Sequence, residues 1–208
     1  MSHGLDQIGS HRLLFVMATK HEYGPALRKR IRPLITGVGP IEAAAGTAVA
    51  LAELAGAGAL PDAVVSLGSA GSRRRPLGEV YQVSSVSWRD IDASPLGFAR
   101  GVTPFADFPA VAELPTPLPG VPTATLSTGA DVVVGAAYDA IDADLVDMET
   151  YAVWRACDRF DVPLIGLRGV SDGVAEGERL DWTALLGLLD ERLARAVDRL
   201  VHVRLSVR

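Results

Sequence analysis

The sequence predicts an α/β protein: a single domain with a mostly parallel or mixed central sheet covered by helices. Three observations support this fold class. The chain has 208 residues, a length that suits one domain. Short apolar runs of strand length alternate with longer helical segments, the pattern of a helix-covered sheet. No internal repeat or linker-like segment divides the chain. We therefore expect one domain at residues 12–208, preceded by a polar, mobile leader at residues 1–11.

Expected strands and helices alternate in the first half of the chain. The apolar run LLFVM predicts a buried strand at residues 13–17. Residues 22–31 have a helical composition, and residues 34–36 form a second short apolar run. Residues 41–59 are rich in alanine and leucine and apolar on nearly every face, which predicts a helix buried by the sheet on one side and open to a second subunit on the other. The run AVVSL at residues 63–67 predicts another buried strand.

Two small-residue turns and a proline-rich loop are expected in the second half. The turns are Gly68-Ser69-Ala70-Gly71 and Ser127-Thr128-Gly129-Ala130, each placed after a strand. Residues 94–122 are rich in proline, which favours a long surface loop. The remaining expected elements are a strand at residues 79–86, a helix at 145–160, a strand at 164–170 and a closing amphipathic helix at 182–203.

Composition and charge exclude several classes of partner. The net charge is −5, and the one basic run, Arg73-Arg74-Arg75, is typical of a solvated loop, so we expect no nucleic-acid partner. The single cysteine, Cys157, allows no disulfide framework. No apolar stretch is long enough to span a bilayer, and residues 1–11 lack the apolar core of a secretory signal. We therefore expect a cytoplasmic protein with no membrane partner.

Common cofactor and nucleophile motifs are missing. The segment Gly37-Val38-Gly39 fails as a dinucleotide-binding turn because Glu42 stands at the next required glycine position. The four histidines have no metal-like spacing with one another or with Cys157. No phosphate-binding P-loop or serine-hydrolase elbow occurs. The sequence thus predicts neither a metal site nor an organic cofactor.

Three acids are expected at the edge of the sheet where ligands bind, beyond the carboxyl ends of the strands: Glu22, Glu149 and Asp172. Each also has a structural interpretation. Glu22 can be a first-turn acid favoured by the helix dipole, Glu149 a solvated helix residue, and Asp172 a cap. Three acids at one edge favour a functional interpretation, because acids with perturbed pKa values gather at active sites.

Three segments of the sequence resemble the nucleoside phosphorylase/nucleosidase superfamily: the Gly68-Ser69-Ala70-Gly71 turn, residues 146–152 (VDMETYA) and residues 168–172 (RGVSD). Within this superfamily they are most similar to 5'-methylthioadenosine/S-adenosylhomocysteine nucleosidases. The resemblance runs from about Leu13 to the final helix. It implies a three-layer α/β sandwich and hydrolysis of the N-glycosidic bond of 5'-thio-substituted adenosines, with a small-molecule purine nucleoside as partner.

The resemblance also implies roles for individual residues. The water-activating glutamate of the family falls on Glu22, and its base-protonating aspartate falls on Asp172. The ribose-binding glutamate falls on Glu149, with Met148 packing on the sugar. The remaining expected substrate-binding residues are Ser69, Ala70, Gly71, Trp182 and the pair that reads adenine through its backbone, Val132 and Val133. One member of that pair is usually aromatic in the family, and here neither is.

Two other functions stay open at this point. Phosphorylases of the same fold carry an arginine before the Gly-Ser turn, where this chain has Ser66, and an anion-binding loop that Thr19-Lys20-His21 replaces. Water is therefore the expected nucleophile, although Lys20 is a residual cation. A nucleoside-binding module without turnover is the third interpretation. The sequence does not rank methylthioadenosine against S-adenosylhomocysteine, deoxyadenosine or a futalosine-type nucleoside.

The resemblance further implies a homodimer. In the family, the segment that matches residues 92–98 reaches into the partner subunit's 5' pocket, with Leu96 at the contacting position. The chain also departs from the family, because the hairpin that normally precedes residues 37–39 is reduced to residues 32–36. We therefore expect the pocket for the 5' substituent to be remodelled.

Overall fold

The computed structural model describes residues 4–173 and 182–205 of the chain. The strands within these residues are β1 (Asp6–Ile8), β2 (His11–Met17), β3 (Leu34–Ile35), β4 (Ala63–Gly71), β5 (Val80–Trp88), β6 (Val111–Glu113), β7 (Thr123–Thr128), β8 (Leu145–Asp147) and β9 (Leu164–Asp172). The α-helices are α1 (Pro25–Arg28), α2 (Pro40–Gly56), α3 (Thr150–Asp158) and α4 (Leu186–Arg199). Short 3-10 helices are η1 (Ser94–Leu96), η2 (Gly135–Ala140) and η3 (Leu200–His202).

The strands form one mixed sheet that curls on itself. Strand β4 pairs in parallel with β2 and β9, and β9 pairs antiparallel with β5. Strand β5 continues in parallel to β7, and β7 to β8. The carboxyl-terminal residue of β4, Gly71, then meets Val146 of β8 in an antiparallel pairing. Strands β4, β9, β5, β7 and β8 therefore form a closed circuit, which brings the ends of strands that are distant in the sequence to one place.

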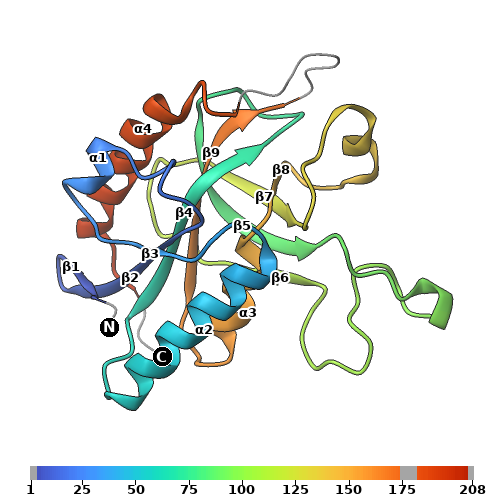
Figure 1. The fold of residues 1–208 in the computed structure, drawn as a ribbon, viewed down its shortest axis with the longest axis horizontal. Coiled ribbons are helices and arrows are strands. Elements are labelled where there is room, and N and C mark those ends of the chain that lie inside the picture. The colour runs from blue at the N-terminus through green and yellow to red at the C-terminus, as the bar shows by residue number, and fades with distance from the viewer. Residues whose placement is uncertain (1–3, 174–181, 206–208) are drawn as a thin grey trace.

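Helices cover both faces of the sheet, as expected for a three-layer arrangement (Figure 1). Helices α2 and α3 pack against one another and share a core with strands β4, β5 and β7, including Leu51, Val153 and Leu126. Helices α1 and α4 pack together on the other face, where Leu27 and Leu193 join a second core with Phe15 of β2. The expected single α/β domain is confirmed. Among the described helices, none is long and apolar enough to cross a membrane.

Several expected element boundaries are wrong. Residues Asp6–Ile8, assigned to the leader, form β1 and pair antiparallel with β2, so the described fold begins before residue 12. Residues 1–3 of the expected leader lie outside the described residues, as do residues 206–208 of the expected domain. The segment Gly68–Gly71 is not a turn, because it continues β4 in register with β9. The helix expected at residues 22–31 is reduced to α1.

The helix expected at residues 145–160 is also partly wrong. Its first three residues form β8, which pairs in parallel with β7, and α3 starts only at Thr150. Glu149 is consequently the residue before the helix rather than a residue within it. The proline-rich segment is a loop, as expected, interrupted by η1 and β6. It projects to the right of the sheet in Figure 1.

Candidate active site

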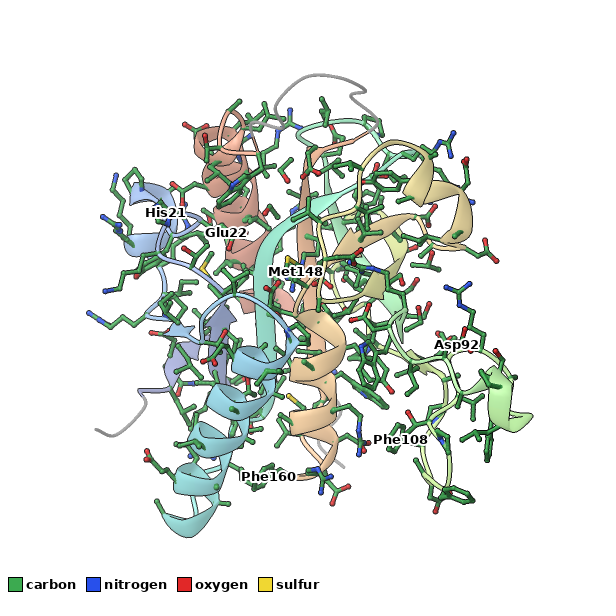
Figure 2. The ribbon with its side chains drawn as sticks, turned by 45° about the vertical axis from the view of Figure 1, so that its right-hand side comes forward. His21, Glu22, Asp92, Phe108, Met148 and Phe160 are labelled. Carbon is green, nitrogen blue, oxygen red and sulfur yellow. The ribbon has the colours of Figure 1, made fainter. Side chains whose placement is uncertain are left out.

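A cavity of about 260 Å³ opens at the carboxyl ends of β2, β4, β7, β8 and β9. Ten of the eleven residues that the sequence nominates line it: Glu22, Ser69, Ala70, Gly71, Val132, Val133, Met148, Glu149, Asp172 and Trp182. Figure 2 shows Glu22 and Met148 in the middle of the molecule, whereas Asp92 lies out on the projecting loop. Leu96, the eleventh residue, lies on this loop in η1, is 74% exposed and does not line the cavity of its own chain.

Glu22 is held against the end of β4. Its Oε1 atom accepts two hydrogen bonds from Ser69, one from the backbone N–H at 2.7 Å and one from the hydroxyl at 2.7 Å. Gly68 makes this approach possible, because a Cβ atom at that position would lie 3.1 Å from Oε1. The Glu22 side chain is buried, so it is a fixed carboxylate inside the cavity and not a solvated first-turn acid. Oε2 is the oxygen that these two bonds leave available.

Glu149 lies between β8 and α3, and its protonation is set by burial. The backbone N–H of Gly39 donates a hydrogen bond of 2.8 Å to its Oε1. Burial, followed by the charge of Asp147, raises the pKa of Glu149 to about 7, against the opposing effects of the Gly39 hydrogen bond and Arg168. In its ionised form, the carboxylate of Glu149 can accept hydrogen bonds from the hydroxyls of a bound ligand.

Asp172 ends β9 at the other side of the cavity. The hydroxyl of Ser171 donates a hydrogen bond of 2.6 Å to its Oδ1. Burial raises the pKa of the Asp172 carboxyl, while the Ser171 hydrogen bond lowers it. A partly buried carboxyl whose pKa is raised is suited to hold and donate a proton.

A buried ion pair supports the floor of the cavity. Arg168 of β9 and Asp147 of β8 approach to 3.0 Å, and both side chains are almost completely buried. Arg168 also donates hydrogen bonds to the Ser66 hydroxyl and to Thr150, and Thr128 donates one to Asp147. This network fixes β4, β7, β8, β9 and the start of α3 to one another. The guanidinium of Arg168 is occupied by these partners, and the hydroxyl of Ser66 is one of them.

Sequence reasoning missed Arg89, which also lines the cavity. Its guanidinium donates to the backbone carbonyl groups of Ser127 and Asp147 and to both the carbonyl and the carboxylate of Asp131. Arg89 thus ties the segment that begins at Asp131 to the end of β8. Its only signal in the sequence is its place three residues after the strand expected at residues 79–86, a place that charged residues of many surface loops also take.

The charge of the cavity is negative. Among the lining residues that the structure describes, five have acidic side chains and one, Arg89, has a cationic one. Lys20, the residual cation of the sequence, is exposed and is not part of the lining. Trp182 is the one aromatic residue among the described lining residues. Within the described parts of the chain, no group of three or more His, Cys, Asp or Glu side chains is arranged to hold a metal ion.

Comparison with known families matches residues 20–202 to the phosphorylase superfamily. A curated 5'-methylthioadenosine/S-adenosylhomocysteine nucleosidase from Actinobacillus succinogenes is 29% identical over 185 residues, which cover 77% of this chain and 78% of the relative. The nucleosidase of the same name from Neisseria meningitidis, solved with methylthio-immucillin-A, has a TM-score of 0.70 at 20% identity, covering 89% of this chain and 98% of that one.

A second solved enzyme with the same fold has a different name. A futalosine hydrolase from Helicobacter pylori, solved as a mutant, has a TM-score of 0.74 at 16% identity and covers 91% of this chain and 98% of its own. At these identities the two structures establish the fold alone. The fold is therefore shared by enzymes whose names specify different nucleosides.

Proposed function

The chain belongs to the phosphorylase superfamily, and from this premise we propose that it is a nucleosidase that hydrolyses the N-glycosidic bond of 5'-thio-substituted adenosines. The products would be adenine and the free thioribose. One observation carries the proposal: Glu22, Glu149 and Asp172 line one cavity in which the described residues supply no free cation for phosphate. The curated relatives are nucleosidases of this type, which supports the same conclusion.

Asp172 is the proposed general acid. An N-glycosidic bond breaks through a sugar with oxocarbenium character, so the purine must leave as a stabilised group. A proton donated to N7 of the base provides this stabilisation. Its raised pKa allows Asp172 to hold that proton before the bond breaks. Asp172 then becomes a carboxylate, and Ser171 already donates a hydrogen bond to its Oδ1.

Glu22 and Glu149 are proposed to act on the sugar. Glu22, fixed by Ser69, would accept a proton from the attacking water through Oε2. Glu149 would accept hydrogen bonds from the ribose hydroxyls, and in its ionised form it would stabilise the positive charge that develops on the ring. Met148 lines the cavity beside it and is proposed to pack on the sugar. Val132 and Val133 would contact the base.

Water is preferred over phosphate on electrostatic grounds. A phosphate dianion in this cavity would face Glu22 and Glu149. Like charges at ~4 Å repel by about 4 kcal/mol at an intermediate dielectric constant. Arg168, the buried cation nearest to Ser66, is bound to Asp147, Ser66 and Thr150. Arg89, the one cation among the described lining residues, is bound to Asp131 and to two backbone carbonyl groups. The phosphorylase alternative therefore lacks a free counter-charge among these residues.

The test is adenine release from 5'-methylthioadenosine, measured in phosphate-free buffer and again with millimolar phosphate. We expect equal rates and an unphosphorylated 5-methylthioribose in both. A rate that requires phosphate and yields a ribose 1-phosphate would replace the proposal with the phosphorylase. The matched variant is Asp172→Asn, which should keep the fold and lose roughly 10²–10⁴-fold in turnover, the usual contribution of a general acid. A wild-type protein that binds the nucleoside without releasing adenine would indicate a binding module.

A further inference from the structure

The hydroxyl of Tyr138 is a buried polar group without a hydrogen-bond partner among the described residues. Tyr138 lies in η2 and is only 6% exposed. Its ring packs with Val133 and Val146, two residues that line the cavity, so it stands directly behind the cavity wall. Buried hydroxyl groups in folded proteins nearly always have a partner, since an unpaired one is costly. This unpaired hydroxyl therefore points to an interaction that forms in another state of the site.

Gly71 brings this hydroxyl to Asp172. A Cβ atom at Gly71 would collide with the Tyr138 hydroxyl and would lie 2.9 Å from Oδ2 of Asp172. Both oxygens therefore lie against the same side of Gly71, where the absence of a side chain leaves room for them. Ser171 occupies Oδ1 of Asp172, so Tyr138 stands on the side of the other carboxyl oxygen. Each carboxyl oxygen can accept hydrogen bonds from two directions. Hydrogen bonds from Ser171 and Tyr138 therefore still leave a position that can face the purine.

The charged groups around Tyr138 come from three other parts of the fold. Burial and then the charge of Asp172 on β9 raise the pKa of Tyr138 to about 12, and Arg89 after β5 opposes them. On the far side, Arg73 and Arg74 after β4 line a second cavity with Tyr138 and with Asp139 of its own helix. Arg73 pairs with Asp139 there. Tyr138 consequently stays a neutral phenol, which can donate a hydrogen bond throughout the working pH range.

We propose that Tyr138 is a positioning residue for Asp172, whose hydroxyl donates a hydrogen bond to Oδ2 of the carboxylate that forms as the proton passes to the base. The inference rests on the proposed role of Asp172 as general acid. The proton leaves Asp172 for N7 of the purine, the N-glycosidic electron pair stays with the purine, and Tyr138 keeps its own proton throughout. Together, Ser171 and Tyr138 would hold both oxygens of the new carboxylate.

The variant Tyr138→Phe tests this role, because it removes the hydroxyl and keeps the ring. Since the hydroxyl has no partner in the described structure, the melting temperature should stay the same or rise. Turnover should fall by about 10- to 100-fold, the usual effect of losing a hydrogen bond to a charged group. The alkaline limb of the pH profile of kcat should move to higher pH, because the carboxylate loses a donor that stabilises it. In an Asp172→Asn background the same change should have no further effect.

The control is Tyr81→Phe, which removes a hydroxyl from another buried tyrosine that does not line the cavity. It should leave both kcat and its pH profile unchanged. If Tyr138 only fills space, Tyr138→Phe will behave like this control, and the inference is wrong.

A second readout does not depend on turnover. The carboxyl groups of aspartate can be labelled with an isotope and followed by NMR, and the signal that disappears in Asp172→Asn belongs to Asp172. This signal should titrate at higher pH in Tyr138→Phe than in the wild type. An unchanged titration overturns the inference even if the wild type is inactive. The wild-type rate of adenine release tests the proposed function separately.

Discussion

Burial and two neighbouring acids raise the pKa of Glu149 to about 7, from an ordinary value of 4.5. Between these two values the folded protein keeps a proton that the unfolded chain has lost. Stability therefore falls as the pH rises through this window, and the full cost is present above about pH 7. Folding thus works against the ionised form of the residue that is proposed to bind ribose.

Glu149→Gln should remove this cost, because a neutral amide can still accept the hydrogen bond from Gly39. We expect the melting temperature of the variant to exceed that of the wild type at pH 8 and to match it at pH 4. The control is Glu113→Gln, at an exposed glutamate of β6, which should change the melting temperature equally little at both pH values. A gain for Glu149→Gln that is the same at both pH values would contradict the pKa argument.

At the scale of elements, β8, β9 and α3 depend on the buried pair of Arg168 and Asp147. Arg168→Met would leave Asp147 as a buried charge without its cation, a change that typically costs 3–5 kcal/mol. Chemical denaturation should therefore show a loss of roughly that size. Arg30→Met, which breaks the exposed pair with Asp198, should cost much less, because an ion pair in contact with water contributes little to stability. Equal losses for the two variants would show that the buried pair is not a support of the site.

How far the sequence predicted these elements depended on local patterns. The apolar runs of β2, β4 and β9 were predicted correctly because they are continuous and lie between turn signals. Leu145–Asp147 was assigned to a helix because three residues are too few to distinguish a strand from a helical turn. Gly68–Gly71 was assigned to a turn because small residues are typical of turns, whereas here they admit Glu22, Tyr138 and Asp172 close to the backbone.

The residues that line the cavity were predicted where a family motif includes them, and they were missed where only the tertiary fold brings them together. Ten of the eleven nominated residues line the cavity because the resemblance carried each of them to a motif position. Arg89, Asp147 and Tyr138 were not nominated for the site. They come together because the closed circuit of strands brings the residue after β5 close to the end of β8, against which Tyr138 of η2 packs. A single sequence contains no local pattern that predicts such long-range contacts.

At the scale of the whole molecule, several of the exposed large apolar side chains lie on the projecting loop and on α2. On the projecting loop, Leu96 is 74% and Phe105 is 97% exposed. On the outer side of α2, Ile41 is 80% and Val49 is 55% exposed. Exposed large apolar side chains on a projecting loop and on one helix fit an interaction surface. They support the proposal that the chain forms a homodimer in which Leu96 reaches the partner's cavity, since it does not line the cavity of its own chain.

Sedimentation velocity at micromolar concentration should therefore show a dimer. Leu96→Asp should raise KM for the nucleoside because a charge would enter the partner's pocket, and Phe105→Asp should shift the protein toward the monomer. The matched control is Arg195→Asp on α4, an exposed position on the face of the sheet opposite to α2, which should change neither sedimentation nor KM. A wild-type monomer with full activity would show that each chain completes its own site, and Leu96 would then be only an exposed residue of a surface loop.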